Sequence, residues 1–287
     1  MMPEKIPPQY VYHYTKFETA LEYILPGKKL KLNQLGKTND PRESKPWDFP
    51  KPFTLGLQGK AKSKEETLVK RISREVARVM RDDWKVLCFS IDEANIGIFE
   101  DPNKKISRKF PYTIHGYSHP RMWAQYAENH RGVCLQFDRE KLEESLQLQF
   151  AGRCYSGEVR YDEGPSIITS FPSLPRNWLS DSSQLGPKGA AVNYVSEHYS
   201  FLFLRKHLDW ETESEYRWLV YSHNKKDEFV SIDGAIKAVL VGSDFSEVYE
   251  PALAKLCESL RISAGRISWS NGNPQVDFES LYKLSAR

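Results

Sequence analysis

The chain has few cysteines, and none of them form a closely spaced pair. Four occur among its 287 residues, at Cys88, Cys134, Cys154 and Cys257, without a CxxC pattern. Cys88 and Cys134 lie inside the apolar, strand-like runs VLCFSI and GVCLQF. Apolar surroundings of this kind are typical of structural cysteine that packs as a small hydrophobic residue. We therefore expect the cysteines to be buried free thiols.

Long hydrophobic runs are also missing. The N-terminus has no basic segment followed by an apolar one, and no apolar run approaches the roughly 20 residues that cross a bilayer. These absences argue against a secretory signal and against a membrane-spanning segment. The expected location is the cytoplasm, with no membrane partner.

Several signature motifs of enzymes do not occur. The sequence contains no GxSxG, no GxxxxGK[ST] and no GxGxxG, so it lacks the signatures of serine hydrolases, P-loop NTPases and dinucleotide-fold dehydrogenases. His115 and His119 have the spacing of helical zinc ligands, but the acid of HExxH is absent, and Gly116 and Pro120 interrupt a helix. We expect no metal site.

What is present is the composition of an ordinary soluble globule. Hydrophobic residues make up 40% of the chain, charged residues 28% and aromatic residues 13%, which excludes wholesale disorder. At 287 residues, the chain is long enough to bury a core as one large α+β domain or two small ones. Its net charge of +3 is too small to indicate nucleic-acid binding by itself.

Hydrophobic periodicity predicts mixed elements along one domain, residues 1–287, with no visible boundary. Alternating residues predict strands at 10–15, near 30–32, and at 85–91, 133–137, 154–161 and 213–221. Two short strands, FVSI and IKAVLVG, are predicted within 229–242, and a closing pair near 267 and 276. Helical spacing predicts helices at 17–25, 65–81, 121–129, 190–207 and 246–260. Turn-rich composition predicts loop insertions at about 36–63 and 164–188, and residues 100–121 are polar and mixed.

The segment WETESEYRWLVY, residues 210–221, combines acids with an apolar strand. Alternation from Glu213 places Glu213, Glu215 and Arg217 on one face of that strand. Two carboxylates about 7 Å apart repel and raise each other's pKa unless a cation lies between or opposite them. The segment is therefore either a solvated edge strand with Arg217 as ion partner, or a costly arrangement kept for a site.

Two further features also have a structural and a functional interpretation. His13 and Ser90 lie in predicted strands, where histidine is often a packed, hydrogen-bonded side chain and serine often caps a turn. On the helix predicted at 65–81, Arg71, Arg74 and Arg78 share a face that is either solvated or able to follow a phosphate backbone.

Five segments together resemble a bacterial family known as a domain of unknown function. They are HYT (13–15), NDPRE (39–43), CFS (88–90), MWAQYAENHRGVC (122–134) and WxxExEYR (210–217), and they span most of the chain. Members of that family tend to occur near phage-defence and toxin genes. The order of the motifs is similar to a distant version of the ADP-ribosyltransferase fold, which implies a split, mostly antiparallel sheet flanked by helices.

The resemblance also implies roles for individual residues. In that superfamily a strand His or Arg holds the ribose of NAD, a middle strand supplies Ser or Tyr, and a Glu, often in Glu-x-Glu, begins a late strand. The matching positions are His13, Ser90, and Glu213 with Glu215. Glu215 would grip the ribose 2′-hydroxyl, and Glu213 would serve the acceptor as general base. The other expected NAD-binding residues are Tyr14, Trp123, Tyr126 and Arg217, and a paired-tyrosine clamp for nicotinamide is absent.

The expected function is thus an NAD-consuming mono-ADP-ribosyltransferase, a toxin or defence effector with no metal. Its acceptor would be a nucleic acid, held by Arg71, Arg74 and Arg78, or a protein, and a partner protein would neutralise it. One alternative is a non-catalytic sensor or partner-binding module of a defence system. Another is a nuclease in which carboxylates gather around magnesium: Asp40, Glu43, Glu213 and Glu215.

Overall fold

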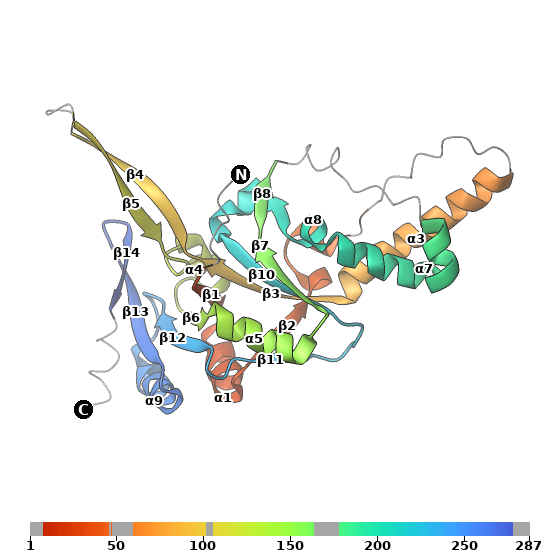
Figure 1. The fold of residues 1–287 in the computed structure, drawn as a ribbon. Coiled ribbons are helices and arrows are strands. Elements are labelled where there is room, and N and C mark those ends of the chain that lie inside the picture. The colour runs from red at the N-terminus through yellow and green to blue at the C-terminus, as the bar shows by residue number, and fades with distance from the viewer. Residues whose placement is uncertain (1–7, 46, 48–59, 102–105, 164–177, 278–287) are drawn as a thin grey trace.

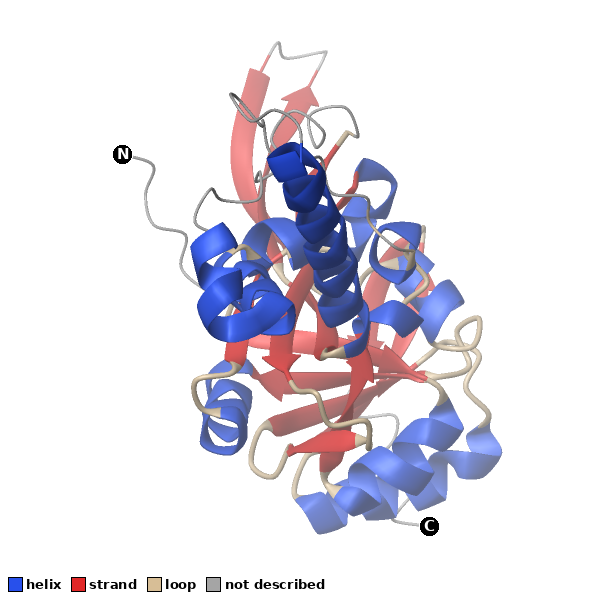
Figure 2. Ribbon diagram, turned by 90° about the vertical axis from the view of Figure 1, so that its right-hand side faces the viewer, coloured by secondary structure: helices blue, strands red, loops and turns tan. Residues whose placement is uncertain are grey.

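The molecule has an α+β fold built on one large sheet. The computed structural model describes residues 8–45, 47, 60–101, 106–163 and 178–277. Helices lie on both sides of the strands (Figures 1 and 2). Nearly all strand pairs are antiparallel, β12 with β13 being a parallel pair in the large sheet. The predicted fold class, a mostly antiparallel sheet flanked by helices, is confirmed.

Ten strands form the large sheet, in the order β11-β2-β3-β1-β6-β12-β13-β14, with β10 joined to β3 and β7. They include a counterpart of every predicted strand, but the strand predicted at 154–161 is divided, and its residues 160–161 belong to a separate short strand. Their bounds are β1 Tyr10–Thr15, β2 Lys29–Gln34, β3 Trp84–Ile91, β6 Val133–Asp138, β7 Cys154–Glu158, β10 Glu215–Tyr221, β11 Glu228–Ser231, β12 Ile236–Val241, β13 Ser263–Ser270 and β14 Asn273–Asp277.

Strand β3 is the point at which the sheet divides. Along one edge it pairs with β10 over its whole length, from Glu215 opposite Ser90 to Tyr221 opposite Trp84. Along the other edge it pairs with β2 only at residues 85–86 and with β1 only at residues 90–91. Strands β1 and β2 therefore separate beside residues 87–89, and the sheet is split there.

Two smaller sheets complete the strands. Strands β4 (Glu93–Asp101) and β5 (Ile106–Ile114) form a hairpin that extends away from the large sheet (Figure 1). No element was predicted in the polar, mixed segment 100–121, which contains the end of β4 and the whole of β5. Strands β8 (Arg160–Asp162) and β9 (Arg205–His207) form a short parallel pair, so residues 205–207 leave the helix predicted there.

The helical segments connect and cover these strands. They are η1 Thr19–Ile24, α1 Leu25–Gly27, η2 Leu35–Lys37, α2 Pro41–Ser44, α3 Lys60–Asp82, α4 Pro120–Tyr126, α5 Arg139–Phe150, α7 Trp178–Glu197, α8 Tyr199–Phe203, η3 Leu208–Glu213, η4 Glu247–Tyr249 and α9 Glu250–Leu260. The predicted helix at 65–81 is confirmed as α3, whose Ile72, Val76 and Val79 are buried as their spacing requires.

The two predicted loop insertions are partly helical. Within 36–63, residue 46 and residues 48–59 lie outside the described part, whereas η2, α2 and the start of α3 are regular. Within 164–188, residues 164–177 lie outside the described part and α7 begins at Trp178. Asp40, the middle residue of the turn signal NDP, accepts a hydrogen bond from the Arg42 N–H and thereby caps α2.

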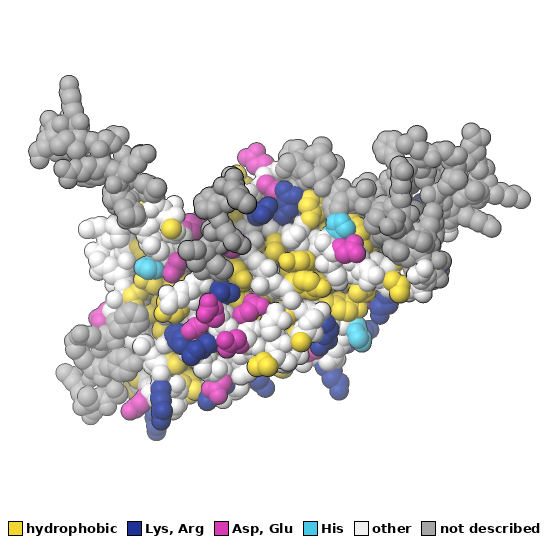
Figure 3. Space-filling model, in the orientation of Figure 1, with side chains coloured by type: hydrophobic (Ala, Val, Ile, Leu, Met, Phe, Trp, Pro, Cys, Tyr) yellow, Lys and Arg dark blue, Asp and Glu magenta, His cyan; other side chains and the backbone are white. Residues whose placement is uncertain are grey.

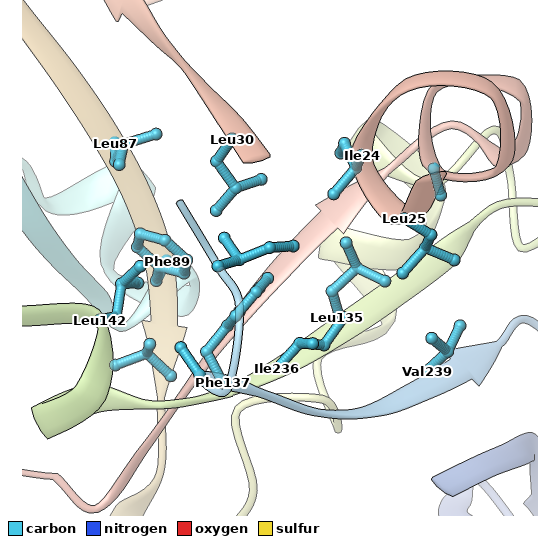
Figure 4. Close-up of a cluster of buried hydrophobic side chains, with 14 of the residues drawn as sticks. Ile24, Leu25, Leu30, Leu87, Phe89, Leu135, Phe137, Leu142, Ile236 and Val239 are labelled. Carbon is cyan, nitrogen blue, oxygen red and sulfur yellow. The ribbon is translucent and has the colours of Figure 1, made fainter. Parts of the chain in front are cut away.

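Each face of the sheet has its own core. On one face, side chains of α1, α5 and α9 pack with those of the strands, including Leu87, Phe89 and Phe137 (Figure 4). On the other face, α3, α7 and α8 cover Trp84, Val86 and Leu219, while α4 covers Tyr12 and Tyr14. The second face thus has two separate apolar clusters, and a space is left between them.

The cysteines and the helices were the subject of two expectations about the whole chain. All four cysteines are free thiols: Cys134 and Cys257 are buried, while Cys88 and Cys154 are half-buried. Among the described helices, none combines the length and apolarity that crossing a membrane requires.

Candidate functional site

A cavity of about 520 Å³ opens on the second face, beside the split in the sheet. This volume lies within the usual range of small-molecule sites. Its floor is formed by strands β1 and β3, and one end is closed by α2, α4, β9 and β10. The residues that line it are Tyr12, His13, Tyr14, Thr15, Lys16, Thr19, Asn33, Lys37, Thr38, Asn39, Glu43, Cys88, Phe89, Ser90, Met122, Tyr126, Lys206, Glu213, Glu215 and Arg217.

Strand register aligns three of these residues across the floor. Tyr12 pairs with Ser90, and Ser90 pairs with Glu215, on three adjacent strands. Directly opposite residues in a sheet share a face, so these side chains point to the same side. The Ser90 side chain is fully buried, and its Oγ has no hydrogen-bond partner among the described residues. A buried hydroxyl without a partner is costly, and a ligand in the cavity would supply one.

His13 reaches the cavity from the split itself. By alternation its side chain belongs to the opposite face from Tyr12, but its Nδ1 lies 3.1 Å from the Cys88 carbonyl oxygen, where β3 has no strand partner on this edge among the described residues. A carbonyl only accepts, so Nδ1 carries the proton and Nε2 is left as an acceptor. Burial lowers the pKa of His13, which the bond to Cys88 opposes, and the ring is neutral near pH 7.

A chain of alternating charges forms the closed end of the cavity. Arg217 is bound to both oxygens of Glu215, with Nε 2.8 Å from Oε1 and Nη2 2.9 Å from Oε2, and its Nη1 lies 2.5 Å from Glu43 Oε1. The Lys206 Nζ lies 3.0 Å from Glu215 Oε2 and 2.6 Å from Glu213 Oε2. All five side chains are at most 5% exposed.

Neutral groups connect the two ends of this chain. The Tyr126 hydroxyl donates to Glu213 Oε1 at 2.8 Å and accepts from the Asn39 amide at 2.9 Å. Asn39 and Glu43 flank the N-cap and first turn of the short helix α2. The contacts therefore form a closed ring, from Glu43 through Arg217, Glu215, Lys206, Glu213 and Tyr126 to Asn39, which we call the charge ring.

The charge ring decides the ionisation of Glu215. Burial alone would raise the pKa of this carboxyl, but the neighbouring Arg217 and Lys206 outweigh it and lower the pKa to about 2. The pKa of Lys206 is raised, because Glu215, Glu43 and Glu213 outweigh a burial that would lower it. Both groups are charged at neutral pH. Glu215 is thus the case in which cations beside two acids prevent the mutual increase in pKa.

The acid-bearing segment differs from its sequence prediction in two ways. Glu213 ends the 3-10 segment η3, and Ser214 has a left-handed backbone with φ of 44°, so only Glu215 and Arg217 belong to the strand. Strand β10 is not a solvated edge, since β3 and β7 pair with it on both sides. The ionic side chains are buried, and the solvated interpretation is wrong.

Most residues predicted for the site lie together. His13, Tyr14, Ser90, Tyr126, Glu213, Glu215 and Arg217 line the cavity, while Trp123 lies behind Tyr14 with its ring centroid 5.2 Å away. The predicted nucleic-acid contacts are elsewhere, on α3. There Arg71 and Arg74 are exposed, but Arg78 is held by Glu75 at 3.0 Å and by Asp83 at 3.7 Å.

Sequence reasoning missed Lys206 and Tyr12 as cavity residues. Lys206 lies in the run LRKHLDW, where nothing distinguishes it from a solvated lysine, and its burial depends on a chain reversal at β9. Tyr12 shares the motif VYHYT with His13 and Tyr14, so its place could have been inferred from alternation. Its hydroxyl lies 3.3 Å from Asp92 Oδ2.

The carboxylates of the nuclease hypothesis come together only in part. Glu43, Glu213 and Glu215 line the cavity, but Lys206 and Arg217 lie between them and occupy their oxygens. Asp40 is directed to its own helix as the cap of α2. In the part of the chain that the structure describes, no group of three or more His, Cys, Asp or Glu side chains is arranged to hold a metal ion.

Comparisons with known proteins give a family match and no function. Residues 122–218 match the model of a family described as "Protein of unknown function (DUF2971)". This segment includes β6, β9 and most of α4 and β10, and thus Tyr126, Lys206, Glu213 and Glu215. The predicted resemblance to an uncharacterised family is confirmed there. A search of curated proteins and a search of solved structures each gave no match.

Proposed function

We propose that the protein is an NAD-dependent mono-ADP-ribosyltransferase whose reaction takes place in the cavity beside the split sheet. One observation carries the proposal. His13, Ser90 and Glu215, which lie far apart in the sequence, come from the adjacent strands β1, β3 and β10 and line the same cavity. These are the residue types and the strand order that the resemblance to ADP-ribosyltransferases implies.

The chemistry needs a carboxylate that remains ionised. The bond from the ribose C1′ to nicotinamide breaks, its electron pair leaves with the nicotinamide nitrogen, and positive charge develops on the sugar. An acceptor nucleophile then bonds to C1′ and loses its proton. Glu215, buried and ionised, would stabilise the developing cation and accept a hydrogen bond from the ribose 2′-hydroxyl. Glu213 would receive the acceptor proton.

The remaining lining fits the other parts of NAD. The Nε2 of neutral His13 can accept from a ribose hydroxyl, and Ser90 Oγ can donate or accept. Tyr12, Tyr14 and Tyr126 offer aromatic surface for a planar ring. Lys16 and Lys37, both exposed, lie at the margin of the cavity where the negative pyrophosphate would find cations.

The proposal extends to the setting of the activity. The acceptor would be a nucleic acid or a protein, and the enzyme would act in the cytoplasm as a toxin or defence effector restrained by a partner protein. The support is the resemblance of the motifs to a family found near defence and toxin genes, together with the exposed Arg71 and Arg74 on α3. No metal enters the proposed reaction.

The decisive measurement is NAD consumption, with and without labelled acceptors, by wild type and Glu215→Gln. The amide keeps the shape and one hydrogen-bond acceptor but removes the charge, so we expect turnover to fall about 100-fold or more. Glu228→Gln is the matched control, since Glu228 forms a similar 2.6 Å ion pair with Lys85 outside the cavity. Equal turnover by wild type and Glu215→Gln would reject the assignment.

One observation favours the sensor alternative. Both oxygens of Glu215 are bound by Arg217, as in a site that holds its shape and binds without reacting. That alternative predicts a higher melting temperature in NAD without any loss of NAD. A nuclease would instead cleave RNA or DNA and lose that cleavage in a chelator.

A further inference from the structure

Lys206 is a member of the charge ring to which the proposed reaction assigns no role. It lies on the short strand β9, whose position is fixed by the pairing of Arg160 with Arg205 and by the 2.6 Å ion pair between Arg205 and Asp162. Its side chain is 5% exposed, and its Nζ lies 5.2 Å from the ring centroid of Trp210. A buried lysine held so closely has little freedom to serve as a mobile surface charge.

The contacts of Lys206 differ from those of Arg217. Arg217 binds Glu215 and Glu43 but is not bound to Glu213. Lys206 is within 3.0 Å of one oxygen from each of Glu213 and Glu215. Like-charged carboxylates in a buried site repel unless a cation joins them. Lys206 is thus the group that allows these two acids to lie side by side at the end of the cavity.

We propose that Lys206 is a positioning residue, whose ammonium holds Glu213 and Glu215 together and facing the cavity. The inference rests on the proposed function for its catalytic meaning, whereas the contact itself can be tested without catalysis. Lys206 touches neither the ribose nor the acceptor in this scheme. It acts through the two carboxylates and keeps Glu215 charged in mildly acidic solution.

The charged and polar groups that face Glu215 determine its pKa together with its burial. They are Arg217 on the same strand, Lys206 on β9, Glu213 on η3, Glu43 on α2, Cys88 and Ser90 on β3, and Tyr161 on β8, whose hydroxyl accepts from the Glu215 N–H at 2.9 Å. Only Lys206 and Arg217 are cations among them. Removal of Lys206 leaves one cation among three acids, so Glu215 should take up a proton at higher pH than in wild type.

The test compares Lys206→Met with Lys206→Arg between pH 3 and pH 8. The melting temperature reports the contact without any need for activity. A carboxyl with a lowered folded-state pKa stabilises the protein above its unfolded pKa, and this stabilisation is lost as pH falls through the folded pKa. The difference in melting temperature between wild type and Lys206→Met should therefore decrease by at least about 3 °C from pH 7 to pH 3. If Lys206 only fills space, this difference should be the same at every pH, and that result would overturn the proposal.

NAD consumption is the second readout. We expect the ratio of wild-type to Lys206→Met turnover to grow at least about threefold from pH 8 to pH 5, because the variant's Glu215 becomes protonated in that range. Lys206→Arg, which keeps the cation, should retain the wild-type pH profile. A parallel profile for Lys206→Met would overturn the proposal and leave the proposed function standing. If wild type consumes no NAD, the proposed function fails and the melting experiment still decides the role of Lys206.

Lys206→Met leaves Glu213 without its cation, which can prevent folding. The double variant Glu213→Gln/Lys206→Met removes both members of that pair and is compared with Glu213→Gln alone. The same narrowing of the melting-temperature gap toward pH 3 is expected between these two proteins. A gap that does not change with pH would again refute the positioning role.

Discussion

At the scale of single residues, the cavity combines groups whose chemical state is fixed by their neighbours. Glu215 is charged because two cations outweigh its burial, and His13 is neutral because desolvation lowers its pKa. Ser90 lines the same cavity, and its Oγ has no partner in the part of the chain that the structure describes. Three kinds of hydrogen-bonding group, a charged acceptor, a neutral acceptor and a hydroxyl, are thus available to one ligand.

The contribution of His13 to ligand binding can be measured directly. A ligand that binds only the folded state raises the melting temperature, by about 2.7 kcal/mol of stability at 100 times its dissociation constant. We expect NAD to raise the melting temperature of wild type by several degrees and of His13→Ala by much less, each relative to the same protein without NAD. The measurement is differential scanning fluorimetry over a range of NAD concentrations.

His223→Ala is the control for this prediction, since His223 is an exposed histidine that does not line the cavity. Its NAD-dependent shift should equal that of wild type. Equal shifts for His13→Ala and wild type would mean that the imidazole does not take part in binding.

Sequence patterns predicted secondary structure well where residues close together in the chain determine it. Alternation placed His13, Ser90 and Glu215 in strands, and the structure agrees. Alternation also placed Arg217 beside Glu215 as an ion partner, and the two residues are paired in β10. The other partners of Glu215 and Arg217 could not be predicted in this way. Glu43 and Lys206 belong to α2 and β9, and only the folded sheet brings these elements into one ion network.

At the scale of elements, the sequence was least informative at turns that break a pattern. Residues 213–217 alternate in type, but the left-handed Ser214 separates Glu213 from the strand. Hairpin β4–β5 was not recognised, because its polar residues and Pro111 weaken strand signals. Helix α3, with long and regular spacing, was predicted within a few residues of its bounds.

The turn after α4 is a tightly packed element within the matched family segment. Glu128, Asn129 and His130 all have positive φ, between 51° and 65°, which non-glycine residues rarely adopt. The turn is held by contacts that include Glu128 Oε2 with the Phe17 N–H and the His130 carbonyl with the Asp244 N–H. It thus supports the chain at Phe17, beside the cavity residue Lys16.

Gly242→Ala tests how firmly this turn is packed against the end of β12. A Cβ at Gly242 would lie 1.9 Å from the His130 carbonyl oxygen, so backbone must move. We expect a loss of about 2–4 kcal/mol in the free energy of unfolding, measured with urea. In Gly27→Ala, the nearest atom to the new Cβ is 3.4 Å away on the flexible Lys29 side chain. That control should change stability by less than about 0.5 kcal/mol, and equal effects would contradict the packing argument.

At the scale of the whole molecule, charge is distributed rather than concentrated. The net charge is +3, and acidic and basic side chains are interspersed on the face shown in Figure 3. Such a surface does not bind nucleic acid through its overall field. A nucleic-acid acceptor would have to be held locally, and Arg71 and Arg74 on α3 are the exposed candidates.

The double variant Arg71→Ala/Arg74→Ala measures that local contribution. If both residues bind phosphates, the affinity for single-stranded RNA or DNA should fall, and the slope of log K against log salt should decrease by about 0.7 for each phosphate that is no longer neutralised. Fluorescence anisotropy at several salt concentrations gives both quantities. Lys225→Ala/Lys255→Ala removes the same charge from exposed positions elsewhere and should leave the slope unchanged. Identical slopes in both double variants would favour a protein acceptor.

The charge ring passes through a single helical turn, and this has a consequence for how ligands enter. Asn39 lies just before the N-cap of α2 and is bound to Tyr126 of α4, whereas Glu43 lies within α2 and is bound to Arg217 of β10. We expect an incoming molecule that displaces either contact to weaken the other, because both belong to one short helical segment. Entry of a ligand and release of Glu43 from Arg217 would then occur together. Ligand binding would thereby change how strongly Arg217 neutralises the charge of Glu215.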